Sequence, residues 1–155
     1  MADPTCRRAG IVDVTFGEGV TVVEPVNLYG CVIGDSTFIG PFVEVQRGVH
    51  IGRRCRIQSH SFICELVTLG DDVVVAHGVM FINDLFQGGG PARGDRTLWR
   101  STVIGDRVSI GSNATVLPVR VCSDVVIGAG AVVTKAITVP GVYAGNPARL
   151  IRPFR

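Results

Sequence analysis

The sequence predicts an all-β protein, a parallel β-helix in the form of a triangular prism with one long extruded loop near residues 83–101. Two observations predict this fold: large apolar residues recur at every sixth position, and the recurrence stops once before it resumes. The composition agrees, because 46% of the 155 residues are hydrophobic, 18% are charged and 20 are glycine. A chain of this size has enough apolar side chains for one packed domain.

The six-residue period is clearest in the first half of the chain. From Ile33 to Phe81 every sixth residue is large and apolar, and we call these residues the anchors. The residue four places after each anchor is small or β-branched. The anchors are Ile33, Ile39, Val45, Ile51, Ile57, Ile63, Leu69, Val75 and Phe81, and the residues four places on are Thr37, Val43, Val49, Cys55, Ser61, Val67, Val73 and Val79.

A period of six matches neither an α-helix nor a simple alternating strand. It matches a short strand followed by a turn, so that three repeats form one triangular coil of about eighteen residues. The anchors point inward, and the small residues fit the inner corners. Neighbouring coils stack about 4.8 Å apart, and because no coil can bury its apolar side alone, stacking supplies the stability.

The repeat continues on both sides of this segment. The spacing is five rather than six between Leu28 and Ile33 and between Val116 and Val121, which predicts two single-residue slips. We expect one domain over residues 1–155, with a lead-in at 1–13, an inserted loop at 83–101 and a C-terminal segment at 138–155. The further anchors are Phe16, Val22, Leu28, Ile104, Ile110, Val116, Val121, Ile127 and Val133.

The coil length converts sequence spacing into contacts. Residues eighteen apart become vertical neighbours, so Arg47, Glu65 and Asn83 are expected in one outer column. By the same rule Ser59 lies below His77.

The interruption of the repeat contains three consecutive glycines and a proline, which break regular structure. It also contains Leu85, Phe86, Leu98 and Trp99, which are too apolar for a loop surrounded by water. We interpret the segment as an arm folded across a subunit boundary, and the alternative is an arm that only holds the oligomer together. The glycines do not indicate a P-loop, because no helix and no Gly-Lys-Ser/Thr follows them.

The remaining composition argues against several classes. A net charge of +2 does not indicate a nucleic-acid-binding protein. No apolar run approaches the roughly 18–20 residues that span a bilayer, and the first residues show no signal-peptide pattern, so a cytoplasmic location is expected. The five cysteines are odd in number and form no Cys-x-x-Cys pair, which indicates free thiols.

Three features together resemble the hexapeptide-repeat acyltransferases: the repeat, the arm, and the runs Val-Ile-Gly-Ala-Gly-Ala-Val-Val-Thr-Lys at 126–135 and Tyr-Ala-Gly-Asn-Pro-Ala-Arg at 143–149. The run Gly-Val-Met-Phe-Ile-Asn-Asp at 78–84 looks like the branch that N-acetylates amino sugars on nucleotide carriers. The resemblance implies a left-handed helix, although parallel crossovers are usually right-handed. It also implies a homotrimer that holds acetyl-CoA in a groove between two coils, with no metal.

The resemblance also implies roles for individual residues. Asn83 would hold the acceptor amine near the thioester, with Asp84 beside it at the mouth of the arm, and His77 would accept a proton from the amine. His77 is equally well explained as an outward turn residue. Substrate contacts are expected from Glu44, His60, Glu65 and Arg93, and cofactor contacts from Gly111, Ala129, Thr134, Lys135, Asn146 and Arg149, of which Lys135 and Arg149 would meet the CoA phosphates.

One departure from the family pattern concerns the acceptor. The O-acetyltransferases of the superfamily carry a histidine where this chain has Asn113. An alcohol needs a general base to attack a thioester, whereas a neutral amine is already nucleophilic. We therefore expect an N-acetyltransferase that uses acetyl-CoA on the amine of a nucleotide-linked amino sugar, of the 3-amino-3,6-dideoxyhexose type, with an O-acetyltransferase on a sugar hydroxyl as the alternative.

Two further alternatives come from other functional classes. A metal protein similar to the γ-carbonic anhydrases needs two histidines five residues apart plus a third, but five places after His77 stands Ile82. His50 is expected at another corner, in contact with solvent. The last alternative is a β-helix without activity that serves only as a scaffold.

Overall fold

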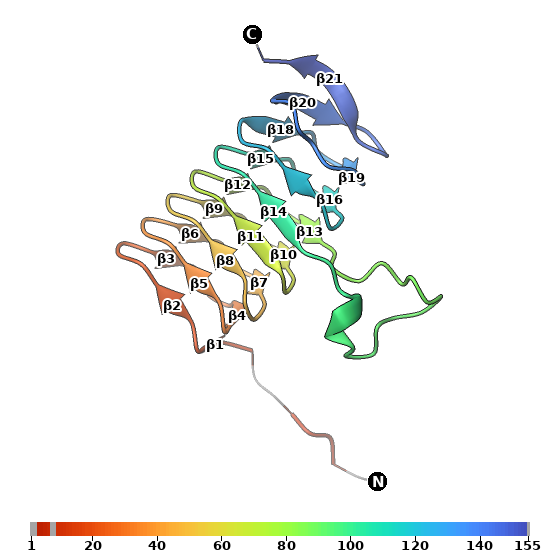
Figure 1. Ribbon diagram of the computed structural model, residues 1–155. Coiled ribbons are helices and arrows are strands. Elements are labelled where there is room, and N and C mark those ends of the chain that lie inside the picture. Colours follow the sequence, from red (N-terminus) through yellow and green to blue (C-terminus); the bar gives the residue numbers. More distant parts are fainter. Residues whose placement is uncertain (1–2, 7–8, 155) are drawn as a thin grey trace.

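The computed structural model describes residues 3–6 and 9–154. Its architecture is a left-handed parallel β-helix of three sheets with one long extruded loop, which confirms the predicted fold class (Figure 1). The expected single domain over 1–155 includes residues 1–2, 7–8 and 155, which lie outside the described residues, and that division stays a prediction. The expected lead-in 1–13 contains a strand, since Ile11 pairs with Leu28.

Each wall of the prism is one sheet. Sheet A has seven strands: β1 (Ile11–Val12), β4 (Asn27–Tyr29), β7 (Glu44–Val45), β10 (Phe62–Ile63), β13 (Met80–Phe81), β16 (Thr115–Val116) and β19 (Val132–Val133). Sheet B has six: β2 (Thr15–Phe16), β5 (Val32–Ile33), β8 (His50–Ile51), β11 (Val67–Leu69), β14 (Thr102–Ile104) and β17 (Arg120–Val121). Sheet C has eight: β3 (Thr21–Val22), β6 (Phe38–Ile39), β9 (Arg56–Ile57), β12 (Val74–Val75), β15 (Ser109–Ile110), β18 (Val125–Ile127), β20 (Gly141–Ala144) and β21 (Arg149–Pro153).

The strand register confirms the coil length and both slips. In the middle of the chain vertical partners are eighteen residues apart, as between Phe62 and Met80. Across each slip they are seventeen apart, as between Phe16 and Ile33 and between Val103 and Arg120. The strands are parallel except for β21, which runs antiparallel to β20 at the C-terminal end.

The core is the inside of the prism. The anchors from Leu28 to Val133 are all buried, and so are the small residues at the inner corners, such as Thr37 and Ser61. Thr37 is satisfied there, because its hydroxyl donates to the Gly52 carbonyl over 3.0 Å. Phe16 is an anchor of the first coil and is 39% exposed, since that coil is stacked on one side only.

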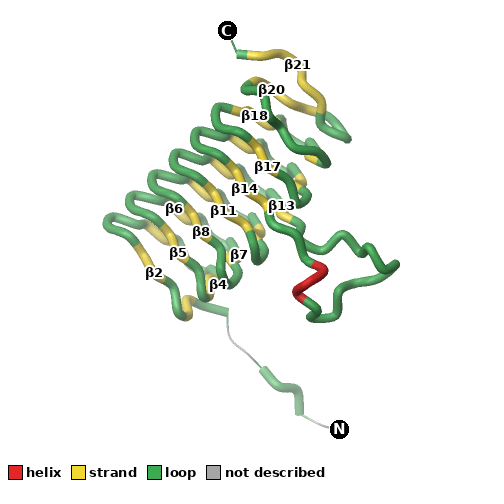
Figure 2. The backbone as a smooth tube through the Cα atoms, viewed as in Figure 1, coloured by secondary structure: helices red, strands yellow, loops and turns green. Residues whose placement is uncertain are grey.

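The arm leaves sheet A after β13 and returns to sheet B at β14 (Figure 2). Its two ends are joined by a hydrogen bond from the Arg100 amide to the Asn83 carbonyl, 2.9 Å long. A single 3₁₀ turn, η1 (Arg96–Leu98), follows Asp95, whose side chain accepts from the Thr97 amide. Phe86 and Leu98 remain 58% and 42% exposed, so the described chain leaves these two apolar side chains of the arm uncovered.

Candidate functional site

The predicted catalytic residues, and some of the predicted substrate and cofactor residues, lie along the two edges of sheet A. The histidine edge is the corner between sheets C and A, formed in successive coils by Phe42, His60, His77 and Asn113. The arm edge is the corner between sheets A and B, formed by Arg47, Glu65 and Asn83, where the arm leaves the prism. Because a strand rises about 3.3 Å per residue, the six residues from His77 to Asn83 span at most about 20 Å and place the two residues on opposite edges of sheet A.

The histidine edge has the predicted vertical order. The Ser59 hydroxyl lies 2.9 Å from Nδ1 of His77, directly one coil below it. His60 stacks on the ring of Phe42, with centroids 4.8 Å apart and planes inclined by 28°. The expectation for His50 was wrong in one respect, because His50 lies in strand β8 and not at a corner.

Asn113 occupies the coil above His77. Its amide donates to the His77 carbonyl over 2.9 Å, and its side-chain oxygen lies against the α-carbon of Gly78. A side chain at Gly78 would collide with that oxygen, which gives a packing reason for the glycine. Asn113 therefore sits beside the backbone of His77, at the position where the resemblance places the histidine of the O-acetyltransferases.

Glu65 organises the arm edge. The Asn83 carboxamide donates from Nδ2 to the Glu65 carbonyl over 3.2 Å, as the predicted column requires. The Glu65 carboxylate forms an ion pair with the guanidinium of Arg96 in the arm, and only 16% of the Glu65 side chain is exposed. Glu65 thus holds the arm both where it leaves the prism, at Asn83, and at its 3₁₀ turn, at Arg96. The Asn83 side-chain oxygen has no hydrogen bond within residues 3–6 and 9–154.

A second carboxylate is connected to this edge. Oε1 of Glu44 accepts from Nε2 of Gln46 over 3.1 Å and lies 3.4 Å from the Tyr29 hydroxyl. Gln46 in turn accepts from the Glu65 amide over 3.3 Å. Burial and the charge of Glu44 raise the pKa of Tyr29, which keeps the phenol protonated as a donor. Glu44 and Glu65 therefore belong to one hydrogen-bonded group on the outside of sheet A.

Asp84 shapes the arm. Its two carboxylate oxygens accept from the amides of Phe86 and Ala92, over 2.9 and 2.7 Å. Arg93 lies farther out, and with Asp84 it lines an open hollow of about 310 Å³ within the arm. The contacts of Asp84 stabilise the backbone of the arm. The catalytic role of Asp84 and the substrate role of Arg93 stay predictions.

The predicted cofactor residues form two groups. Lys135 and Arg149 line one hollow of about 320 Å³ near the C-terminal end, with Tyr143 beside them. Thr134 is exposed next to Lys135, and Asn146 lies in the turn between β20 and β21. The second group, Gly111 and Ala129, is stacked on the histidine edge, where a side chain at Gly111 would collide with the Ala129 backbone.

Sequence reasoning missed four contributors to these edges: Tyr29, Phe42, Gln46 and Arg96. A bulky aromatic such as Phe42 at a turn position was a usable signal, because glycine and polar residues fill most equivalent positions. The contacts of Arg96 depend on how the arm folds back, which the repeat does not specify.

The described part of the chain contains no group of three or more His, Cys, Asp or Glu side chains arranged to hold a metal ion. Among the same residues no helix has the length and apolar character needed to cross a bilayer.

Two family models match the chain. Residues 30–65 match the bacterial transferase hexapeptide model, and residues 101–135 match the hexapeptide repeat of succinyl-transferase. Among curated proteins, serine acetyltransferase of Mycobacterium tuberculosis is 37% identical over 112 residues, covering 70% of this chain and 45% of that protein. The bifunctional protein GlmU of Synechococcus elongatus is 33% identical over 141 residues, covering 82% of this chain and 29% of that protein. The chain thus spans less than half the length of these relatives.

Solved structures share the fold. A point mutant of AntD, an N-acyltransferase from Bacillus cereus in complex with dTDP and coenzyme A, superposes with a TM-score of 0.81 at 20% identity, over 94% of this chain and 86% of that one. Galactoside acetyltransferase in complex with coenzyme A gives a TM-score of 0.64 at 26% identity, over 93% of this chain and 66% of that one. Together with the matched repeats and the three-sheet prism, these likenesses show that the chain is a hexapeptide-repeat protein with the fold of these transferases.

Proposed function

We propose that the protein is an acetyl-CoA-dependent N-acetyltransferase that acts on the amine of a nucleotide-linked amino sugar. The observation that carries the proposal is Asn113 on the histidine edge, one coil above His77, whose carbonyl accepts the Asn113 amide over 2.9 Å. An alcohol acceptor needs a general base at this place, and asparagine cannot serve as one. A neutral amine attacks a thioester with much less help, so this edge suits an amine.

The donor is assigned to the C-terminal end of the prism. Lys135 and Arg149 share one hollow, and no acidic residue follows Asp124 in the sequence. Cations in a region without carboxylates favour the phosphates of coenzyme A. The relatives bound to coenzyme A have the same fold, which supports this assignment.

The acceptor is assigned to the arm edge. The free side-chain oxygen of Asn83 accepts a hydrogen bond from the sugar amine. The Glu65 carbonyl holds Asn83, and the Glu65 carboxylate holds the arm through Arg96. Holding the amine in a near-attack geometry is worth on the order of 7–11 kcal/mol in favourable cases. Glu44 and Arg93 contact other parts of the substrate. The nucleotide carrier follows from the resemblance and from the dTDP complex of AntD.

The chemical step needs only a proton acceptor beside the two substrates. The amine nitrogen attacks the thioester carbonyl, the C–S bond breaks, and coenzyme A leaves as the thiolate. The proton lost by nitrogen passes to His77 or to that thiolate. Backbone amides of a coil stabilise the oxyanion of the intermediate.

The site is completed between two copies of the chain in a trimer. The catalytic candidates of one chain lie on opposite edges, and the cofactor candidates are divided in the same way. In a closed three-fold assembly the histidine edge of one copy faces the arm edge of the next. Each boundary then holds His77 from one chain and Asn83 from its neighbour.

A substrate panel tests the activity. Nucleotide-linked amino sugars and the same sugars with a hydroxyl in place of the amine are incubated with acetyl-CoA, and release of coenzyme A is measured. We expect the amines to react at least about tenfold faster, because a hydroxyl needs a general base at the position that Asn113 occupies and an amine does not. Equal rates would favour the O-acetyltransferase alternative. A stoichiometric bound metal would favour the metal protein, and no stabilisation by coenzyme A would favour the scaffold.

Mixed trimers test the shared site. His77→Ala and Asn83→Ala chains are co-expressed with different tags, and trimers that carry both tags are purified. We expect the purified mixed trimers to recover activity, because each trimer that carries both tags has one of its three boundaries with an intact His77 and an intact Asn83. If the mixed trimers are as inactive as the separate variants, His77 and Asn83 do not act together from two different chains.

A further inference from the structure

The N-terminal part of the histidine edge carries a hollow beside Glu44, whose contact on the substrate has not been specified so far. It measures about 230 Å³ and is lined by Pro25, Val26, Asn27, Phe42 and Glu44, among others. The engineered cavity that binds benzene measures about 150 Å³, so this hollow has room for one six-membered ring with substituents.

Phe42 supplies an aromatic face to the hollow. His60 stacks on one side of its ring, yet 57% of Phe42 remains exposed. Phe42 also adopts a left-handed backbone conformation, with φ of 60°, which a bulky residue adopts only at a cost. Core packing does not explain an exposed, stacked aromatic ring at this turn, whereas a planar ligand on its free face does.

Polar groups border the same hollow. Asn27 and Glu44 are directly paired neighbours on strands β4 and β7 of sheet A. Glu44 uses Oε1 for Gln46 and Tyr29, and its Oε2 has no hydrogen bond within the described residues. A carboxamide offers both donors and an acceptor, and a carboxylate offers acceptors. Together they complement a ring edge that presents an N–H between two carbonyls.

We propose that Phe42 is the stacking platform for the pyrimidine base of the nucleotide-linked acceptor, with Asn27 and Glu44 on the edge of that base. Uracil and thymine present an N–H flanked by two carbonyls, and their single ring suits the hollow. A purine has a second ring, which the hollow does not accommodate as well. The inference rests on the proposed function, because the acceptor must carry a nucleotide for the platform to have a role.

Nucleotide binding to the purified full chain tests the platform. Titration calorimetry with dTDP, UDP and ADP, in saturating coenzyme A so that ADP cannot occupy the donor site, gives the affinities of wild type, Phe42→Ala and Phe42→Trp. Stacking of a base on an aromatic side chain is worth about 1–3 kcal/mol, so Phe42→Ala should bind dTDP or UDP at least about fivefold more weakly. Phe42→Trp should keep most of the affinity, and ADP should bind most weakly to wild type.

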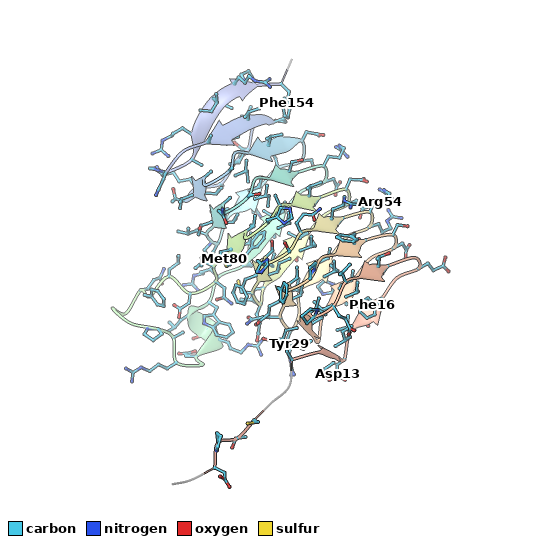
Figure 3. The ribbon with its side chains drawn as sticks, turned by 180° about the vertical axis from the view of Figure 1, so that it is seen from behind. Asp13, Phe16, Tyr29, Arg54, Met80 and Phe154 are labelled. Carbon is cyan, nitrogen blue, oxygen red and sulfur yellow. The ribbon has the colours of Figure 1, made fainter. Side chains whose placement is uncertain are left out.

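A matched control separates this effect from general loss of an exposed aromatic residue. Phe154 is 42% exposed and lies at the opposite end of the prism from Phe16 and the hollow (Figure 3). Phe154→Ala should leave the affinity for dTDP and UDP unchanged, and Phe42→Ala should leave the affinity for coenzyme A unchanged. Glu44→Gln should weaken pyrimidine binding while the melting temperature stays near that of wild type.

Three results would overturn the platform: wild-type affinity in Phe42→Ala, equal loss in Phe154→Ala, or tighter binding of ADP than of dTDP and UDP. The substrate panel distinguishes this failure from failure of the proposed function. If amino sugar nucleotides are acetylated and Phe42→Ala binds dTDP or UDP normally, only the platform is wrong. If wild type binds coenzyme A but no nucleotide and acetylates none of the panel, both are wrong.

Discussion

Charged side chains are paired in different ways at two corners of the prism. At the corner between sheets B and C, Arg53, Arg54 and Arg107 are paired with aspartates one coil above, with N–O distances of 2.8, 2.7 and 2.7 Å. We call this corner the salt-bridge edge. At the arm edge, Glu65 is paired with the arm, and Asn83 keeps an unused oxygen.

The difference separates residues that hold coils together from residues that are available to a ligand. At the salt-bridge edge the paired aspartates bind arginines of the same chain, and Asp71 also accepts the Arg53 backbone amide over 2.8 Å. Their polar atoms are used within the chain. At the arm and histidine edges polar and aromatic groups remain open, and those are the edges on which the catalytic candidates lie.

The largest expected effect is on turnover at the arm edge. Asn83→Ala removes the oxygen that would orient the amine, and we expect turnover to fall at least about tenfold. Asp124→Ala, a change on the salt-bridge edge, is the matched control and should leave turnover near wild type. Steady-state release of coenzyme A measures both. Full activity in Asn83→Ala would show that Asn83 does not orient the amine, and the proposed difference between the arm edge and the salt-bridge edge would then be wrong.

A smaller effect is expected from the arm itself. The Arg96 guanidinium lies 5.8 Å from the centre of the Trp99 ring, a cation–π distance, and the same guanidinium pairs with Glu65. Trp99→Ala should loosen the arm, raise KM for the acceptor several-fold and lower trimer stability. Enzyme kinetics and the melting temperature measure these changes. If neither changes, the arm does not fold across a subunit boundary.

The salt-bridge edge should respond to acid. The backbone amide and guanidinium of Arg53 lower the pKa of Asp71, and Arg54 and Arg107 lower the pKa of Asp72 and Asp124 below the usual 3.8. A lowered folded-state pKa stabilises the protein above the unfolded value and less as pH falls through the folded value. The melting temperature should therefore decline below about pH 4, and less steeply in Asp72→Asn. An equal decline in that variant would assign the acid response to other carboxylates.

The smallest effect concerns the buried thiols. Burial raises the pKa of Cys31 to about 11 and of Cys64 to about 12, so both stay protonated and unreactive at neutral pH. A thiol reagent at about pH 7.5 should modify the exposed Cys6 first and leave activity unchanged. Rapid modification of Cys31 or Cys64, located by mass spectrometry, would show that the coils open more readily than their packing indicates.

The sequence was informative wherever a rule repeats. Anchors, inner-corner residues, both slips and the Ser59–His77 and Glu65–Asn83 neighbours all followed from spacing, because every coil obeys the same geometry. The Arg96–Glu65 ion pair could not be predicted from spacing, because it depends on the path of the arm. The Phe42–His60 stack could not be predicted either, because it depends on the rotamers of two side chains. Spacing also does not say which edges of neighbouring copies meet, so the separation of His77 from Asn83 became visible only in three dimensions.

The closure of the arm by Asn83 and Arg100 has an evolutionary consequence. The strand that follows the arm, β14, pairs with β11 in the coil below, Val67 with Thr102, as though nothing had been inserted. Closing a longer loop costs only about 0.6 kcal/mol for each doubling of its length. Insertions and deletions can therefore accumulate in the arm without changing the six-residue repeat of the coils. New acceptor preferences can then arise by changes in the arm alone.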